Sequence, residues 1–177
     1  LVTKWSNLRL IGHKNQSDIG DSNMDITFKT SEGKFNYRVC AVIINDDKIL
    51  AMQDERSPYY YLPGGRVSLN ETAEKAIKEE LEIDAKIVRP LWLNQGFFVE
   101  DVTGEKYHEL CIYFLIDISN TDLLEKGNKF RLIEREHTHD FEWIEFERLQ
   151  DEYIYPVFIK KKIFDLPDYL VLQDEHE

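Results

Sequence analysis

Runs of apolar residues, broken by short polar turns, make up much of the first half of the chain. Residues 37–44 are almost continuously apolar, residues 45–47 read Asn-Asp-Asp, and residues 48–52 form a second apolar run. Two such runs joined by a short polar turn predict a β-hairpin. The three consecutive tyrosines at residues 59–61 predict a short strand that leads into a pair of glycines.

A second pair of strands and a polar segment follow. Residues 85–99 predict a long strand interrupted at Pro90, and residues 107–118 predict its partner across a turn at Gly104. Residues 119–140 are polar and predict a long loop. The last expected elements are a strand at residues 141–146, a helix from Tyr155 to Phe164, and an acidic tail after Pro167.

Residues 62–84 join a glycine turn to an amphipathic helix. Gly64 and Gly65 permit backbone angles that other residues avoid, so the main chain there can approach a ligand or a metal closely. After the turn, apolar residues recur at helical spacing, which predicts one buried face. The residues of this face are Ala73, Ala76, Ile77 and Leu81.

Glu80 is a charged residue on that apolar face. At about 100° per residue it falls about 20° from Ala73, with Glu79 at the edge of the stripe. A buried carboxylate is stabilised by protonation, by a cationic partner or by a metal, and spacing leaves a metal-bound and a salt-bridged Glu80 equally open. Glu71 and Lys75 lie away from the stripe, which predicts a solvated ion pair.

These residues resemble the Nudix hydrolase family, whose box reads Gly, five residues, Glu, seven residues, Arg-Glu, an aliphatic, any residue, Glu-Glu. Gly65, the five residues after it and Glu71 match its first half, and both flanks of the segment are similar to the family. Over residues 64–84 the box is four residues short. The Arg-Glu pair of the family is absent.

The family pattern can be laid on the chain in two ways. Without a gap, Glu80 takes the place of the glutamate in Arg-Glu, and Ile83 and Asp84 stand where the paired glutamates belong. With a four-residue gap, Glu79 and Glu80 become the paired glutamates, and this alignment is favoured because residues 81–88 then run from helix end into strand. Either the protein has lost part of its box, or the sequence omits a short arginine- and glutamate-bearing segment that the natural protein contains between about Lys75 and Lys78. The second explanation is preferred.

The resemblance implies an α/β fold, a Nudix-like α/β/α sandwich with a mixed sheet over about residues 36–165. It implies hydrolysis of a pyrophosphate bond in nucleoside diphosphates linked to another group, with Mg²⁺ or Mn²⁺ as the cofactor. Glu79 and Glu80 are then the catalytic residues and, with Gly64, the metal ligands. The substrate-binding candidates are Gly64, Gly65, Arg66 and Arg56.

Two further interpretations stay open beside the enzyme. The shortened box is compatible with a catalytically weakened Nudix-like module that binds a ligand or regulates a partner. It is also compatible with a structural α/β domain whose acidic helix is only a solvated face. Arg56 is a candidate phosphate ligand, although a surface arginine beside two acids is the commoner case. His137 and His139 are expected to face solvent.

The composition of the chain restricts the partners and the cellular location that we expect. The formal charge of −12 argues against a protein that coats nucleic acid, and it favours a divalent ion for any work on a polyanion. Cys40 and Cys111 lie in apolar runs typical of buried, reduced cysteine, and no membrane-length apolar segment is present. We therefore expect a cytoplasmic protein that takes a small nucleotide-type substrate and forms a possible homodimer. Residues 1–23 are expected to be an extension or leader, and residues 24–177 a single domain.

Overall fold

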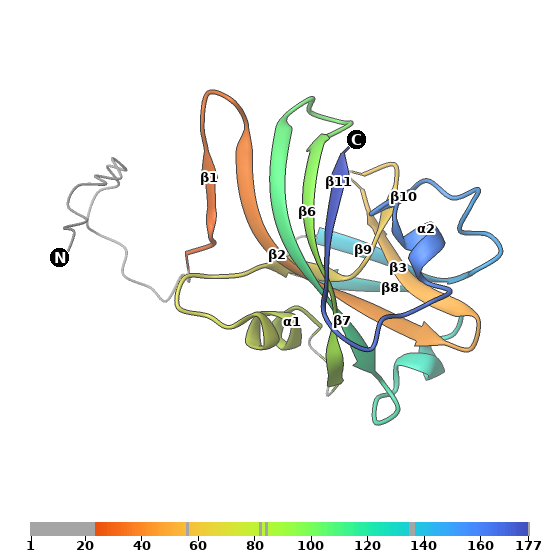
Figure 1. Ribbon diagram of the computed structural model, residues 1–177. Helices are drawn as coiled ribbons and strands as arrows, with labels where there is room; N and C mark the ends of the chain where they lie inside the picture. Colours follow the sequence, from red (N-terminus) through yellow and green to blue (C-terminus); the bar gives the residue numbers. More distant parts are fainter. Residues whose placement is uncertain (1–23, 56, 82, 84, 135–136, 177) are drawn as a thin grey trace.

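A computed structural model describes residues 24–55, 57–81, 83, 85–134 and 137–176 (Figure 1). The expected extension, residues 1–23, lies outside the described residues. The structure consists mainly of strands. In chain order these are β1 (Thr27–Lys29), β2 (Lys34–Asn45), β3 (Lys48–Asp54), β4 (Tyr60–Tyr61), β5 (Gly64–Arg66), β6 (Lys86–Val99), β7 (Lys106–Asp117), β8 (Lys129–Glu134), β9 (His137–Glu145), β10 (Ile154–Tyr155) and β11 (Val171–His176). The helices are α1 (Ala73–Leu81), the 3-10 turn η1 (Leu123–Lys126) and α2 (Ile159–Lys162).

The sheet is mixed, as the sequence predicts. Its strands follow the order β10-β4-β3-β2-β7-β6-β11, and β2 also pairs with β1 and β5. β2 runs parallel to β7, while β7 and β6 form the expected antiparallel pair. The predicted first hairpin is also present, with Ile44 opposite Ile49. The expected interruption at Pro90 is a shift of register on both sides of this residue, which cannot donate to the ladder.

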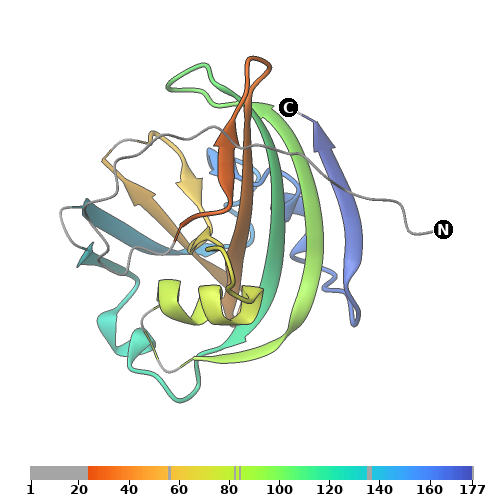
Figure 2. The same ribbon diagram turned by 90° about the vertical axis from the view of Figure 1, so that its left-hand side faces the viewer.

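Each face of the sheet carries its own apolar cluster, because side chains alternate along β2. Val39, Ala41 and Ile43 pack with Ala76 and Ile77 of α1. The residues between them face the opposite way, and Cys40 and Val42 pack with Ile159 of α2. The two helices therefore cover opposite faces, which confirms the expected α/β/α layering (Figure 2).

The polar segment 119–140 is not a loop. It contains η1 and most of a second hairpin, in which β8 pairs with β9 and β9 pairs with β3. Phe130 and Leu132 alternate with charged residues there, so the strand signal was present but diluted by charge. Ring stacking of Phe130 on Phe141, with centroids 5.1 Å apart, ties the hairpin together.

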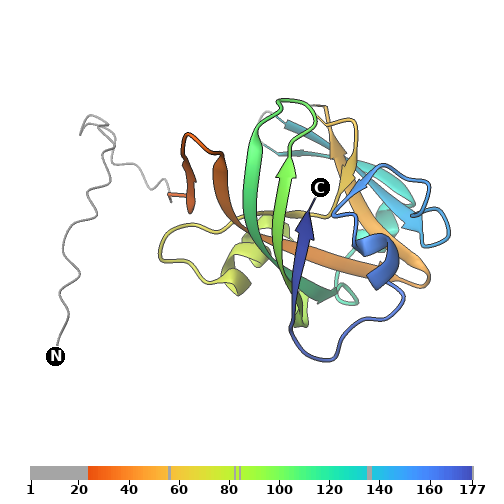
Figure 3. The same cartoon turned by 45° about the horizontal axis from the view of Figure 1, so that its top comes forward.

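The C-terminal region also departs from expectation. The predicted helix from Tyr155 to Phe164 shrinks to α2, because Ile154 and Tyr155 pair with β4 instead. The expected acidic tail forms β11, which runs parallel to β6 over its whole length (Figure 3). Its acidic residues concealed an edge strand, since Asp and Glu have low strand propensity.

Cys40 and Cys111 are buried and free, as expected, with their sulfur atoms 3.6 Å apart. Within the described part of the chain, no helix has the length and apolarity needed to cross a membrane.

Candidate active site

Strand β5 carries the two glycines of the turn, and each is required by a different neighbour. A Cβ built on Gly64 would overlap the backbone carbonyl of Val39 and lie 2.8 Å from the Cα of Cys40, so β5 can approach β2 this closely only without a side chain. A Cβ built on Gly65 would overlap the carboxylate of Glu80. The glycine pair therefore lets β5 approach β2 on one side and a helix carboxylate on the other.

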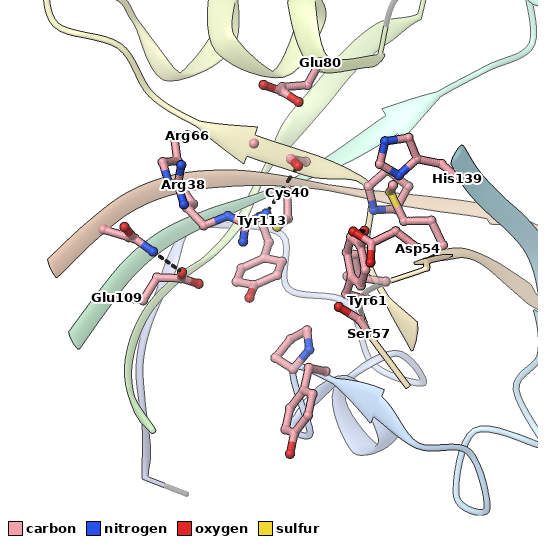
Figure 4. Close-up of a pocket in the computed structure, with 18 of the residues that line it drawn as sticks. Arg38, Cys40, Asp54, Ser57, Tyr61, Arg66, Glu80, Glu109, Tyr113 and His139 are labelled. Atoms are coloured by element: carbon pink, nitrogen blue, oxygen red, sulfur yellow. Dashed lines mark hydrogen bonds between the residues drawn. The ribbon is translucent and has the colours of Figure 1, made fainter. Parts of the chain in front are cut away.

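Glu80 is exposed, which contradicts its expected place on the buried face of α1. Only Ala76 and Ile77 of this helix are buried, and the helix ends at Leu81. The end of the Glu80 side chain nevertheless lies against Gly65, on the α1 side of β5 (Figure 4). The buried face of α1 is thus narrower than the apolar stripe calculated from the sequence.

Glu71 is held in a fixed position, rather than solvated as the sequence suggests. Its side chain is 5% exposed, and its carboxylate accepts a hydrogen bond of 2.9 Å from the Ser68 amide and one of 3.1 Å from Lys75. The bond from the Ser68 amide, followed by those from lysine, lowers the pKa of Glu71 despite burial. Glu71 therefore fixes the path from the turn to the helix.

Lys75 connects this fixed glutamate to the exposed one. Its ammonium lies 3.1 Å from Glu71 and 2.7 Å from Glu79, whose side chain is 55% exposed. The Thr72 hydroxyl accepts from the Lys75 amide and caps the helix. The helix is continuous from Ala73 to Leu81, so the shortened box forms one unbroken helix in which Lys75 pairs with two box glutamates.

Arginines lie on the other side of β5. Arg38 donates a 3.3 Å hydrogen bond to the Gly64 carbonyl, and Arg66, its cross-strand neighbour, forms a 3.3 Å ion pair with Asp25. Burial alone would lower the pKa of Arg38, but Glu109, the two cysteines and Tyr113 together outweigh burial and raise the pKa. Arg56, the other predicted phosphate ligand, lies outside the described residues.

The oxygen atoms of Glu79, Glu80 and Gly64 suit a hard divalent cation, because Mg²⁺ is commonly bound by one or two carboxylates and completes its shell with water and phosphate. The fit rests on Gly65, whose missing side chain leaves room for the Glu80 carboxylate. Among the described residues, no three His, Cys, Asp or Glu side chains come together as a metal-binding group.

A cleft of about 1290 Å³ runs from this turn to the face of the sheet opposite α1. Glu79, Glu80 and both glycines line one end of it. His139 is half-buried and also lines it, contrary to the expectation that it faces solvent, whereas the side chain of His137 lies outside the described residues. Figure 4 shows Arg38, Glu109 and Tyr113 on the side of β2 away from Glu80.

The sequence analysis did not identify the polar residues that line the cleft on this second face. They are Asn36, Arg38, Asn94 and Glu109. The available signal was polar residues with a period of two inside apolar strands, since Asn36 and Arg38 share a face of β2. The apolar residues around them are typical of a buried strand and concealed that signal.

Tyrosines and acids line the cleft beside the turn between β6 and β7. They come from the segment before β4, from this turn and from β10. Tyr59 donates to Glu100 at 3.0 Å, and Tyr155 donates to Asp101 at 3.0 Å. Burial first, and then the hydrogen bond to Glu100, raises the pKa of Tyr59 to about 12, although a hydrogen bond with Ser57 acts against them. The hydrogen bonds from Thr103 and neighbouring amides lower the pKa of Glu100 to about 2.

Comparison with known proteins identifies the domain. The sequence model of the NUDIX domain matches residues 34–164. An ADP-ribose pyrophosphatase from Methanocaldococcus jannaschii is 26% identical over 88 residues, which are 48% of this chain and 52% of that protein. The match therefore spans about half the length of this curated relative.

Two solved structures share the fold. A mutator MutT protein from Bacillus halodurans superposes with a TM-score of 0.54 at 13% identity, covering 80% of this chain and 89% of that one. A NUDIX hydrolase from Nitrosomonas europaea gives a TM-score of 0.51 at 11% identity, covering 80% and 79%.

Proposed function

The chain belongs to the NUDIX family, and from this premise we propose that it is a divalent-metal-dependent hydrolase of nucleoside diphosphates linked to another group. The observation that carries the proposal is the position of the Glu80 carboxylate, which lies against Gly65. Both residues belong to the region that matches the NUDIX family model. Because the archaeal relative is named an ADP-ribose pyrophosphatase, ADP-ribose is the first compound to test.

Glu79, Glu80 and the Gly64 carbonyl would hold Mg²⁺ or Mn²⁺. When bound, such an ion neutralises phosphate charge and lowers the pKa of a coordinated water. Glu71 positions the turn through the Ser68 amide, and Lys75 restrains Glu71 and Glu79. In the overall reaction, water adds to one phosphorus atom, the bridging P–O bond breaks, and both products leave as phosphate esters.

Arg38 contributes a fixed positive charge beside the turn. Its guanidinium holds the Gly64 carbonyl in place and lines the cleft, where a diphosphate would approach. Arginine suits this role because it stays charged when buried and its planar group matches phosphate oxygens. Arg66 and Arg56 are additional candidates for phosphate binding.

The test is a screen for phosphate-ester products from ADP-ribose and other nucleoside diphosphate derivatives, with and without Mg²⁺ or Mn²⁺. Activity should require the metal, and Glu80→Gln should reduce kcat at least 100-fold without lowering the melting temperature. Glu74→Gln, at an exposed position of the same helix, is the matched control and should retain activity. Turnover by Glu80→Gln within about threefold of wild type would remove Glu80 from the mechanism.

A binding or regulatory module remains the second candidate because two predicted metal ligands already have cationic partners. Lys75 lies 2.7 Å from Glu79, and Arg38 donates to the Gly64 carbonyl. This candidate predicts nucleotide binding by titration calorimetry without turnover of any compound in the screen. Metal-dependent turnover that disappears in Glu80→Gln would exclude it.

A further inference from the structure

The sheet face opposite α1 carries a polar row within an otherwise buried surface. Register places Arg38 of β2 beside Cys111 of β7, and Cys111 beside Asn94 of β6. Neighbouring strands are about 4.8 Å apart, so the backbones of Arg38 and Asn94 are separated by about 10 Å across the floor of the cleft. Both residues line the cleft, together with Gly96 two residues after Asn94.

Asn94 is the unusual member of this row. It is only 4% exposed, and its side-chain amide donates a 3.4 Å hydrogen bond to Glu175 of β11. This bond fixes the orientation of the amide, because the reverse orientation would place an oxygen against a carboxylate. The Oδ1 atom is therefore a buried acceptor, and no described residue donates a hydrogen bond to it.

Arg38 presents the opposite chemistry at the other end of the row. One terminal nitrogen donates to Gly64, while its buried Nε donates to no described residue. The cleft thus has an unused cationic donor beside the turn and an unused acceptor next to Glu175 farther along the sheet, with Glu109 near both ends. A ligand that satisfies both ends has an anionic group at one end and hydrogen-bond donors at the other.

Sugar hydroxyls suit the acceptor end better than a nucleobase edge does. An asparagine that reads a base uses its oxygen and its nitrogen together. In Asn94 the nitrogen is already used by Glu175, which leaves one acceptor and nearby carboxylates. Hydroxyl groups are donors that match such a set one at a time.

We infer that this face of the cleft is a sugar-phosphate subsite in which Arg38 binds the phosphoryl group and Asn94 accepts a hydrogen bond from a sugar hydroxyl. The inference rests on the proposed function and narrows its substrates to diphosphates that carry a sugar on the group beyond the phosphates. Asn94 is a specificity-determining residue in this assignment.

The test measures binding of ribose 5-phosphate, 2-deoxyribose 5-phosphate and inorganic phosphate by titration calorimetry in metal-free buffer. The wild-type protein should bind ribose 5-phosphate at least tenfold more tightly than inorganic phosphate. Asn94→Leu should remove that preference while keeping the phosphate affinity, and Arg38→Met should weaken all three compounds. Asn120→Leu, in the exposed turn after β7, is the matched control and should bind like wild type.

Equal affinity of the wild-type protein for ribose 5-phosphate and phosphate would overturn the subsite without any variant. An unchanged preference in folded Asn94→Leu, with folding checked by circular dichroism, would overturn the role of Asn94. These outcomes are separate from those of the activity screen, because binding is measured without metal. Sugar-phosphate binding without turnover would keep the subsite and reject the hydrolase, and turnover with no sugar preference would do the reverse.

Discussion

The carboxylate of Glu80 occupies the space that a side chain at Gly65 would fill. This contact connects the turn to the last turn of α1, and it separates the roles of the two glycines. The neighbour of Gly65 is the far end of a flexible side chain, whereas the neighbours of Gly64 include the backbone of β2. The two positions should therefore respond differently to the same substitution.

Gly65→Ala should reduce metal-dependent activity at least tenfold with little loss of stability, because the Glu80 side chain can move away but then no longer lies over the turn. Gly64→Ala should destabilise the fold by about 1–3 kcal/mol, since the added methyl overlaps backbone atoms. Denaturant unfolding and initial rates of the two variants check both statements. Equal effects on stability would contradict the distinction.

Lys75→Met should increase the affinity for Mg²⁺ or Mn²⁺ severalfold. A cation that binds Glu79 must compete with the Lys75 ammonium, which lies 2.7 Å from this carboxylate. Lys78→Met, at the next exposed lysine of the helix, is the control. Isothermal titration with metal is the measurement, and unchanged affinity in Lys75→Met would show that Glu79 is not a ligand.

The free energy of unfolding should fall steeply in acid as Glu142 becomes protonated. It is 3% exposed, and its carboxylate lies 2.8 Å from Lys129 and 2.7 Å from Arg148, with the Tyr60 hydroxyl also at 2.8 Å. Burial alone would raise its pKa, but these partners outweigh burial and lower the pKa to about 2. Because the folded pKa lies below the unfolded value, the stabilisation is present above about pH 4.5 and is lost as the pH falls towards 2.

The size of this effect is on the order of 3 kcal/mol, from a depression of about two units at about 1.4 kcal/mol per unit. Glu142→Gln should be less stable at pH 7 and should lose less stability than wild type between pH 4.5 and 2. The exposed Glu145→Gln should follow the wild-type profile. Parallel profiles of wild type and Glu142→Gln, measured by urea unfolding at several pH values, would contradict the prediction.

The shortened box makes a prediction of its own. An arginine-bearing segment between Lys75 and Lys78, as the sequence analysis prefers, would be cut by an arginine-specific protease. Because the bond between Arg89 and Pro90 resists such proteases, cleavage of the natural protein would then give two peptides from the region after Arg66 up to Arg131. One peptide with the mass calculated for residues 67–131 would reject the segment, and the helix would be short by nature.

The sequence was sufficient to predict the elements whose patterns are purely apolar. The first hairpin and the long pair of strands at β6 and β7 were expected because apolar residues predominate in them. β8 and β11 were missed because their exposed positions carry charges, and β11 pairs with β6, a strand distant in sequence. Sequence periodicity does not encode that partner.

The candidate site was predicted where a motif spans neighbouring residues. The turn at Gly64 and Gly65 is local, and Glu71 was expected to orient the box from the resemblance alone, whereas Glu80 was expected on the buried face of the helix. Arg38 and Asn94 come together only through the order of the strands, so no local pattern could have paired them.

β11 lies after the region that matches the family, residues 34–164, yet it supplies Glu175, which orients Asn94. Glu175 also accepts a 2.8 Å hydrogen bond from the Phe158 amide, so this one carboxylate joins β11 to both the sheet and the start of α2. The residue that orients Asn94 therefore lies outside the part of the chain that carries the box. Exchange or redesign of this terminal segment offers a route to new ligand selectivity while the turn and α1 stay unchanged.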